Sequence, residues 1–224
     1  AGLAELVTNE IASHPRAHGI APPPHVVAAG SSHHQRMIDK STASVTAESG
    51  SNIVVISAAF TGDRRAIPHV MNHDVVYLEW HGRLLQSLKT AGFNVISKRH
   101  PKGLLSNTPL FTGFSDSEII GVRMNRLQEG VGAFVLDVAG SAFIEAMCSL
   151  KPVVLIDIPN RRMTDQGRAI IQESAQIVVA KFDDRNRITV DNRELVDAIQ
   201  RPVDIEARRR FVDDYLLNTA ATAF

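Results

Sequence analysis

The stretch AFVLDVAGSAFIEAMCSLKPVVLID, residues 133–157, decides the fold of this chain. It opens with the apolar run 133–137, which is typical of a buried parallel strand, and it closes with a second such run after Pro152. Between the two runs, Gly140 and Ser141 form a turn from which a helix can begin. A strand, a helix and a strand in this order predict a βαβ unit with its two strands parallel.

The same alternation of strands and helices continues on both sides of this unit. Further strands are predicted over 53–56, 94–98 and 175–180, and helices over 74–91, 115–128, 141–150, 168–174, 192–199 and 204–217. Asp74 is expected to cap the first of these helices, and Gly92 is expected to end it. The alternation predicts an α/β fold with a Rossmann-like, doubly wound parallel sheet. Such sheets bind ligands beyond the carboxyl ends of their strands, so functional residues are sought in the turns that follow strands.

A change in composition near residue 50 indicates a domain boundary. A helical pattern over 2–18 and a short strand over 25–30 come first. A polar segment over 41–51, rich in Ser, Thr, Ala and Gly, then has the composition of an exposed linker. We therefore predict that residues 1–50 are a tail plus linker and that residues 51–224 form the Rossmann-like domain.

Charge and composition argue against several classes of protein. Lys and Arg together number 24, and so do Asp and Glu, which leaves no basic surplus for nucleic acid or for an anionic membrane surface. Cys148 is the single cysteine, which rules out an internal disulfide, favours a reducing compartment and suits a small buried apolar side chain. There is no apolar stretch of about 18 residues and no signal-peptide pattern, so we expect a cytoplasmic protein.

The turn after the strand 133–137 carries the strongest functional pattern. Asp137 ends the strand, Gly140 lets the backbone approach a ligand, and Ser141 is placed to cap the following helix. The free N–H groups at a helix start favour a phosphate, and Glu145, one turn further on, can accept hydrogen bonds from ribose hydroxyls. The alternative is a structural cap with Glu145 in solvent.

A second candidate site follows the strand 94–98, in the sequence SKRHPK. Lys98, Arg99 and Lys102 supply cations for a diphosphate, and charge-assisted hydrogen bonds to phosphate are strong. His100 can pair with the phosphate or protonate it as it leaves. The alternative is that the three cations are solvated charges at a strand end and that His100 caps a turn.

A third candidate loop follows the strand 53–56 and contains the sequence GDRR. Arg64 and Arg65 place two guanidinium groups where a ligand of the sheet would lie. The alternative is an ordinary surface loop.

Several familiar ligand-binding patterns are absent from the sequence. No G-x-G-x-x-G follows the first strand, and the chain contains no P-loop and no Cys-x-x-Cys pair. The close histidine pairs are His33 with His34 and His69 with His73, and their loop context argues against a preformed metal site. We therefore expect neither a metal nor a required cofactor.

In this order, the three loops resemble the C-terminal half of GT-B-type transferases of the CDP-glycerol glycerophosphotransferase and teichoic-acid polymerase type. They are also similar to capsule polysaccharide transferases and to bacterial sialyltransferases with a His-Pro motif. The matching positions are Lys98, His100, Pro101, Asp137, Gly140, Ser141, Glu145 and the run Lys151-Pro152-Val153. The likeness extends to the segment 26–39 and to the segment 209–217, which resembles a closing helix that crosses back to an N-terminal domain.

The resemblance implies that the chain binds a nucleotide-activated donor linked through CDP, CMP or UDP. The implied donor-binding residues are Arg64, Arg65, Lys98, His100, Asp137, Gly140, Ser141 and Glu145. Of these, His100 is the catalytic candidate because it would stabilise the leaving phosphate, whereas Glu145 would bind the ribose or the transferred group. A glycosyl or glycerophosphoryl group would pass to a hydroxyl of a surface polysaccharide or of a lipid-linked acceptor.

The resemblance further implies that residues 1–50 are the tail of an acceptor-binding N-terminal domain that is missing from this chain. We therefore expect the chain to fold alone but to show no transferase activity. Alternatively, a second copy of the chain holds this tail, and the chain is then a homodimer. The inner face of the membrane is the alternative to a purely cytoplasmic location. Two other functions stay open at this point, a nucleotide-sugar epimerase of the same fold and a non-catalytic nucleotide-binding domain.

Overall fold

The computed structural model describes residues 30–43, 51–60, 72–101, 107–127, 130–159 and 163–217. Its strands are β1 (Asn52–Ile56), β2 (Asn94–Lys98), β3 (Ser117–Ile119), β4 (Val131–Leu136), β5 (Val153–Asp157), β6 (Gln176–Val179), β7 (Lys181–Phe182) and β8 (Ile188–Thr189). Its helical elements are α2 (Ser32–Ala43), α3 (Asp74–Thr90), the 3₁₀ turn η1 (Met124–Arg126), α4 (Ser141–Met147), α5 (Asp165–Ser174), α6 (Asn192–Gln200), α7 (Ile205–Val212) and the π-helical turn η2 (Asp213–Leu217).

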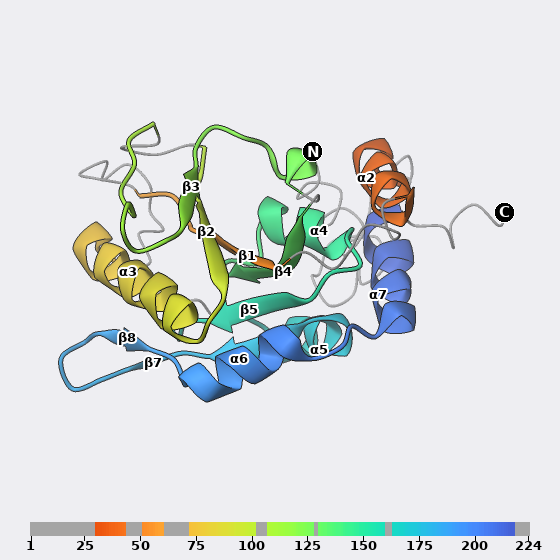
Figure 1. The fold of residues 1–224 in the computed structure, drawn as a ribbon. Coiled ribbons are helices and arrows are strands. Elements are labelled where there is room, and N and C mark those ends of the chain that lie inside the picture. Colours follow the sequence, from red (N-terminus) through yellow and green to blue (C-terminus); the bar gives the residue numbers. More distant parts are fainter. Residues whose placement is uncertain are drawn as a thin grey trace, which may run out of the picture.

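Six strands form one parallel sheet in the order β3-β2-β1-β4-β5-β6 (Figure 1). The fold is therefore α/β and Rossmann-like, as predicted. Strands β2 and β3 lie on one side of β1, and β4, β5 and β6 lie on its other side. At this switch point the strands end level, because Ile56 pairs with Lys98 on one side and with Leu136 on the other. Loops from both halves of the sheet can therefore meet at its carboxyl edge.

Both faces of the sheet are covered, and alternate residues of each strand pack on opposite faces. Ile53 and Val55 belong to a hydrophobic cluster with α3 and α6, whereas Val54 and Ile56 belong to a cluster with α4, α5 and α7. The central strands β1, β4 and β5 are mostly apolar because both of their faces are buried. The same alternation decides on which side of the sheet each side chain at a strand end lies.

Several predicted elements are confirmed close to their expected bounds. The strand 94–98 has the predicted limits, and the helix predicted over 74–91 is α3, after which Gly92 adopts a φ of 92°. The predicted capping role of Asp74 is wrong, because His73 is the N-cap residue and Asp74 is the first residue inside the helix. The hairpin formed by β7 and β8 was not predicted.

The helix predicted over 115–128 is wrong, since this segment forms β3 and then η1. The Glu118 carboxylate accepts the backbone N–H groups of Leu110 and Phe111 at 3.0 Å each, which ties the segment to the loop before it. Gly121 then adopts a φ of 71°, which a helix does not permit. The apolar spacing that suggested a helix instead serves a short edge strand and the residues that follow it.

Helix α2 packs on the α4 side of the sheet. Its Met37 is 4% exposed and belongs to the cluster on the α4 side of the sheet. The backbone N–H of Ser31 donates to the carbonyl of Leu216 at 3.1 Å, so the start of α2 (orange in Figure 1) is tied to η2, which follows the blue helix α7. Residues 41–43 are helical, although they were predicted to begin the linker. The domain boundary near residue 50 stays a prediction, and residues 1–29 and 44–50 lie outside the described residues.

Arg208 of α7 joins three loop ends on the α4 side of the sheet. The residue is 2% exposed, and its guanidinium group donates to the carbonyls of Ser149 at 2.8 Å, Ser174 at 3.0 Å and Lys151 at 3.3 Å. Burial lowers the pKa of Arg208 to about 10. The carbonyls at the ends of α4 and α5 thus find a partner that their own helices cannot provide.

Two further sequence expectations concern burial and hydrophobic length. Cys148 is 4% exposed, as a small apolar side chain would be, and burial raises the pKa of its thiol to about 12. Within the described ranges, no helix combines the length and the apolar character that crossing a bilayer requires.

Candidate functional site

A cavity of about 370 Å³ lies at the carboxyl edge of the sheet. Its walls come from the ends of β1 and β2, from the segment that follows β3, and from α2 and α4. The polar side chains that line it are His33, Lys98, His100, Arg123, Ser141 and Glu145. The apolar side chains are Ile56, Pro101, Val122, Met124 and Ala142. The cavity thus occupies the place where ligands of such sheets bind.

Four residues proposed from the sequence come together in this cavity. Lys98 and His100 reach it from the end of β2, whereas Ser141 and Glu145 reach it from α4, which follows β4. The two loops are distant in the sequence, and the parallel sheet brings them together because β1, which separates β2 from β4, ends level with both. Arg64 and Arg65, also proposed, lie outside the described residues.

Two other proposed residues do not line the cavity. Asp137 is 4% exposed and lies directly after β4. Gly140 is the N-cap residue of α4, and a Cβ added there would approach Val138 Cγ1 at 3.6 Å, which is ordinary packing distance. The structure therefore supplies no steric reason for a glycine at position 140.

Ser141 does not have the capping role that was predicted for it. The cap is Gly140, which makes no side-chain bond, and Ser141 is the first residue of the helix. Its side chain is exposed and lines the cavity. The helix begins at residue 141 as predicted, but its cap lies one residue earlier, so the Ser141 hydroxyl is available to a ligand instead of serving as the cap.

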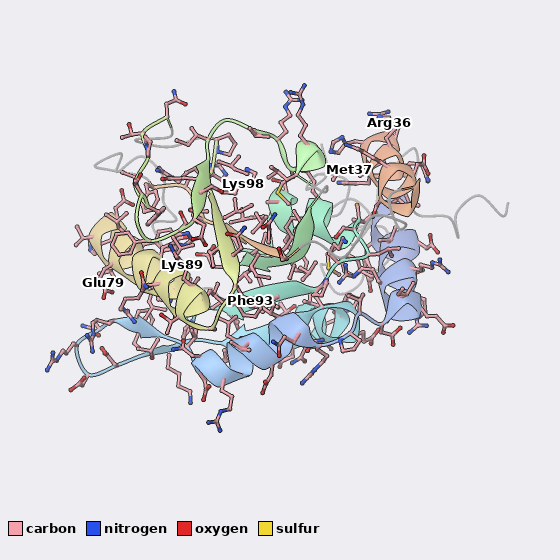
Figure 2. All side chains as sticks on the ribbon, in the orientation of Figure 1. Arg36, Met37, Glu79, Lys89, Phe93 and Lys98 are labelled. Atoms are coloured by element: carbon pink, nitrogen blue, oxygen red, sulfur yellow. The ribbon has the colours of Figure 1, made fainter. Side chains whose placement is uncertain are left out.

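Lys98 is the last residue of β2 and carries its label in Figure 2. Only 4% of the residue is exposed, and its Nζ donates to the carbonyl oxygen of Arg99 at 3.3 Å. Burial lowers the pKa of the Lys98 ammonium group, and the negative charge of Glu145 partly opposes this. The alternative of a solvated strand-end charge is therefore wrong for Lys98. A partly desolvated ammonium group that lines a cavity is well suited to an anionic ligand.

Arg99 lies on the opposite side of the sheet and does not line the cavity. Its guanidinium carbon lies 5.1 Å from the ring centroid of Phe60, and its Nη1 lies 3.3 Å from Oε1 of Glu118. Nη1 also donates to the carbonyl of Thr108 at 2.7 Å. The expectation that Arg99 supplies a phosphate-binding cation is therefore wrong, because its side chain holds the loop before β3. Lys102, the third proposed cation, lies outside the described residues.

Two residues of the cavity were not proposed from the sequence. Nε2 of His33 lies 3.3 Å from Oε1 of Glu145, with 45% and 22% of the respective side chains exposed. Arg123 adds a second cation from the segment between β3 and η1. No local pattern indicated either residue, since His33 had been considered only as half of a histidine pair. Among the residues that the structure describes, no group of three or more His, Cys, Asp or Glu is arranged to hold a metal ion.

The combined chemistry of the cavity suits a ligand with an anionic end and several hydroxyl groups. Lys98 and Arg123 are cations, and two histidines can give or take protons. Glu145 is the carboxylate among the lining residues and can accept hydroxyl hydrogen bonds, while apolar side chains such as Ile56 and Met124 supply contact area.

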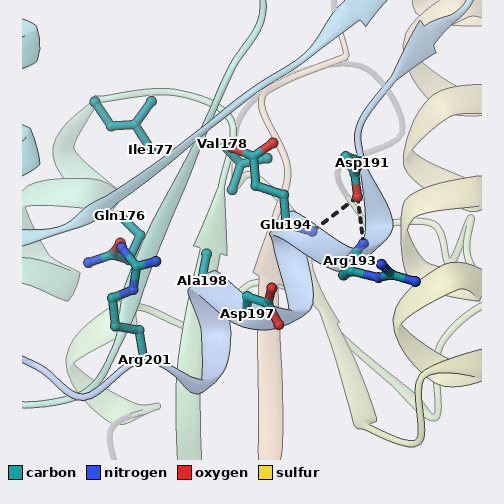
Figure 3. A pocket seen from close by; sticks show the side chains of 9 residues that line it. All are labelled: Gln176, Ile177, Val178, Asp191, Arg193, Glu194, Asp197, Ala198 and Arg201. Carbon is teal, nitrogen blue, oxygen red and sulfur yellow. Dashed lines mark hydrogen bonds between the residues drawn. The ribbon is translucent and has the colours of Figure 1, made fainter.

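Two other hollows lie away from the carboxyl edge. One, of about 310 Å³, runs along α6 beside the start of β6 (Figure 3). There the Asp191 carboxylate accepts the backbone N–H groups of Arg193 and Glu194, and Arg201 donates to Gln176 at 2.8 Å. These polar groups satisfy one another. A second hollow, of about 420 Å³, lies between α3 and α6. The cavity at the carboxyl edge remains the strongest candidate because buried and titratable groups from several loops converge there.

No family model matches the sequence, and no curated protein matches it. Among solved structures, the chain is similar to the apo form of UGT2 from Phytolacca americana, with a TM-score of 0.47 and 15% sequence identity. The similarity covers 97% of this chain and 52% of that chain, so this chain spans about half the length of the structure that it matches.

Proposed function

We propose that this chain is the donor-binding part of a glycosyltransferase or glycerophosphotransferase and that the cavity holds the phosphates of a nucleotide-activated donor. One observation carries the proposal. Lys98, His100, Ser141 and Glu145, which are the expected phosphate and ribose ligands, line a single cavity at the carboxyl edge of the sheet.

Each lining group has a role in this proposal. Lys98 and Arg123 neutralise the phosphates, and the Ser141 hydroxyl donates to a phosphate oxygen. Glu145 accepts hydrogen bonds from the ribose hydroxyls. His100, when protonated, pairs with the leaving phosphate and can transfer its proton to it. The cavity thereby stabilises the charge that accumulates on the leaving group.

The transfer step moves one group between two oxygens. The acceptor hydroxyl oxygen forms a bond to the anomeric carbon or the phosphorus of the donor, and the bond from that atom to the leaving phosphate oxygen breaks. The nucleotide departs with this electron pair, and the acceptor proton passes to a base. In this proposal the acceptor and the base belong to a separate N-terminal domain, so the chain alone binds donor without transferring it.

Calorimetric titration of this chain with UDP, CDP, CMP-sialic acid, CDP-glycerol and UDP-sugars tests the proposal. At least one nucleotide should bind, and Lys98→Met should weaken that binding about tenfold or more, as expected for a lost charge-assisted hydrogen bond. Arg201→Met is the matched control, because this cation lines the hollow beside α6. The proposal fails if no nucleotide binds or if both variants weaken binding equally.

A further inference from the structure

We propose that His33 is a positioning residue of this cavity, which holds one oxygen of Glu145 so that the carboxylate is oriented for the vicinal hydroxyls of a ribose. The inference rests on the proposed function and deepens it, because it assigns the selection of a ribonucleotide to a pair of residues. His33 acts through Glu145 and takes no part in the transfer step.

The first observation is the geometry of the pair. Nε2 of His33 lies 3.3 Å from Oε1 of Glu145 and donates to it in the tautomer that carries its proton on Nε2. Within the described part of the chain, Oε2 of Glu145 makes no hydrogen bond or ion pair. The Glu145 side chain is 22% exposed and lines the cavity, so this second oxygen is accessible to ligand hydroxyls.

The second observation is that the backbone of His33 is held from a distant part of the chain. The N–H of Ser31 donates to the Leu216 carbonyl, and a Cβ added to Gly30 would overlap the carbonyl oxygen of Leu217. Met37, one helical turn beyond His33, is buried. The start of α2 is therefore docked on η2 through its backbone, and the apolar face of the helix packs into the hydrophobic cluster on the α4 side of the sheet.

The third step concerns which partner of the pair is restrained. Glu145 reaches the cavity through a flexible side chain that loses rotamer freedom when it binds a ligand. A docked imidazole that already holds one of its oxygens removes part of this loss before the ligand arrives. His33 should therefore strengthen the binding of ligands that use Glu145 and leave other ligands unaffected. A nucleotide with ribose hydroxyls can use Glu145, whereas a nucleotide that lacks these hydroxyls cannot.

The experiment compares UDP and CDP with their 2′,3′-dideoxy counterparts on the intact chain. In the wild type the ribonucleotide should bind about tenfold more tightly, and Glu145→Gln should remove most of this ratio. His33→Ala should lower the ratio about three- to fivefold, and His33→Gln, which keeps an N–H donor, should restore much of it. Gln35→Ala is the control on the same helix, because Gln35 is exposed and bonds to Asp39.

Each other outcome overturns the inference in a recognisable way. If His33→Ala weakens both nucleotides equally, the residue is only structural and the positioning role is refuted. If His33→Ala keeps the wild-type ratio while Glu145→Gln loses it, His33 has no role but the proposed function stands. If the wild-type chain binds neither nucleotide, both the inference and the proposed function fail.

Discussion

Lys98 and Arg99 are adjacent in the chain, but their side chains lie on opposite sides of the sheet. Lys98 lines the cavity together with Ile56 on the α4 side, whereas Arg99 packs over Phe60 on the α3 side and pairs with Glu118. Neighbouring residues along a strand point to opposite faces, so one short motif provides a cation that lines the cavity and a cation that holds a loop.

This division predicts that substitution of Arg99 affects stability, whereas substitution of Lys98 affects nucleotide binding. Arg99→Met leaves the buried Glu118 carboxylate without its cation and should lower the free energy of unfolding by about 3–5 kcal/mol. Lys98→Met removes a partly desolvated ammonium group and should lower nucleotide affinity with little loss of stability. Urea unfolding measures the first effect, and calorimetric titration measures the second. Comparable destabilisation by both variants would contradict the assignment.

The second prediction concerns catalysis by His100. In a protein that includes the proposed acceptor domain, His100→Ala should lower the rate of the proposed transfer about 10- to 100-fold, the equivalent of a lost charge-assisted hydrogen bond of about 1.5–3 kcal/mol. Because His100 is half-buried at a strand end, the substitution should change the unfolding free energy of the protein by less than about 1 kcal/mol. His73→Ala is the control at an exposed histidine. Normal turnover of His100→Ala would reduce His100 to a turn residue.

The third prediction follows from a histidine in the core. His81 is 1% exposed, it packs 4.7 Å from the Phe111 ring, and within the described ranges neither of its ring nitrogens has a hydrogen-bond partner. Burial and, to a smaller extent, the charge of Arg99 lower the pKa of His81 to about 3.

Between about pH 6.5 and about pH 3, the unfolded chain therefore binds a proton at His81 that the folded chain does not bind. Stability should fall with decreasing pH across this window, with His81 contributing up to about 1.4 kcal/mol per pH unit. In His81→Phe this contribution should disappear, so the pH dependence of its unfolding free energy should be shallower than in the wild type. His73→Gln, at an exposed position, should keep the wild-type slope.

A fourth prediction compares neighbouring arginines on α7. Arg208→Met removes the donor for the carbonyls of Ser149, Ser174 and Lys151 and should cost about 3 kcal/mol of unfolding free energy. Arg209→Met changes an exposed residue of the same helix and should alter the unfolding free energy by less than about 0.5 kcal/mol. Chemical denaturation of the two variants under identical conditions provides the measurement. Equal stabilities would show that water replaces the guanidinium group without cost.

The fifth prediction compares two glycines. Gly30→Ala should displace the start of α2, because the new Cβ would overlap the carbonyl of Leu217, and it should therefore lower the melting temperature. Gly82→Ala adds a methyl group inside α3 at ordinary distance from the Phe114 ring, 3.4 Å, and should stabilise the helix by up to about 1 kcal/mol. Hydrogen exchange should show faster exchange in α2 for Gly30→Ala alone. Unchanged protection there would mean that α2 docks without this close approach.

Local pattern determined most of the fold. The apolar runs of β1, β2, β4 and β5 are short and bounded by turns, so each could be recognised without knowledge of its neighbours. The helix expected over 115–128 shows the limit of this reasoning. Its apolar spacing is compatible with a helix, and the strand forms because Glu118 binds Arg99 and the backbone of a preceding loop, contacts that no local window contains.

The same distinction applies to the candidate site. Lys98, His100, Ser141 and Glu145 could be proposed from the sequence because they follow strands, and the carboxyl ends of parallel strands share one edge of a sheet. His33 could not, since its place beside Glu145 depends on the docking of α2 against η2, at the other end of the chain. Sequence periodicity specifies what each segment forms, whereas long-range packing alone decides which distant segment completes the cavity.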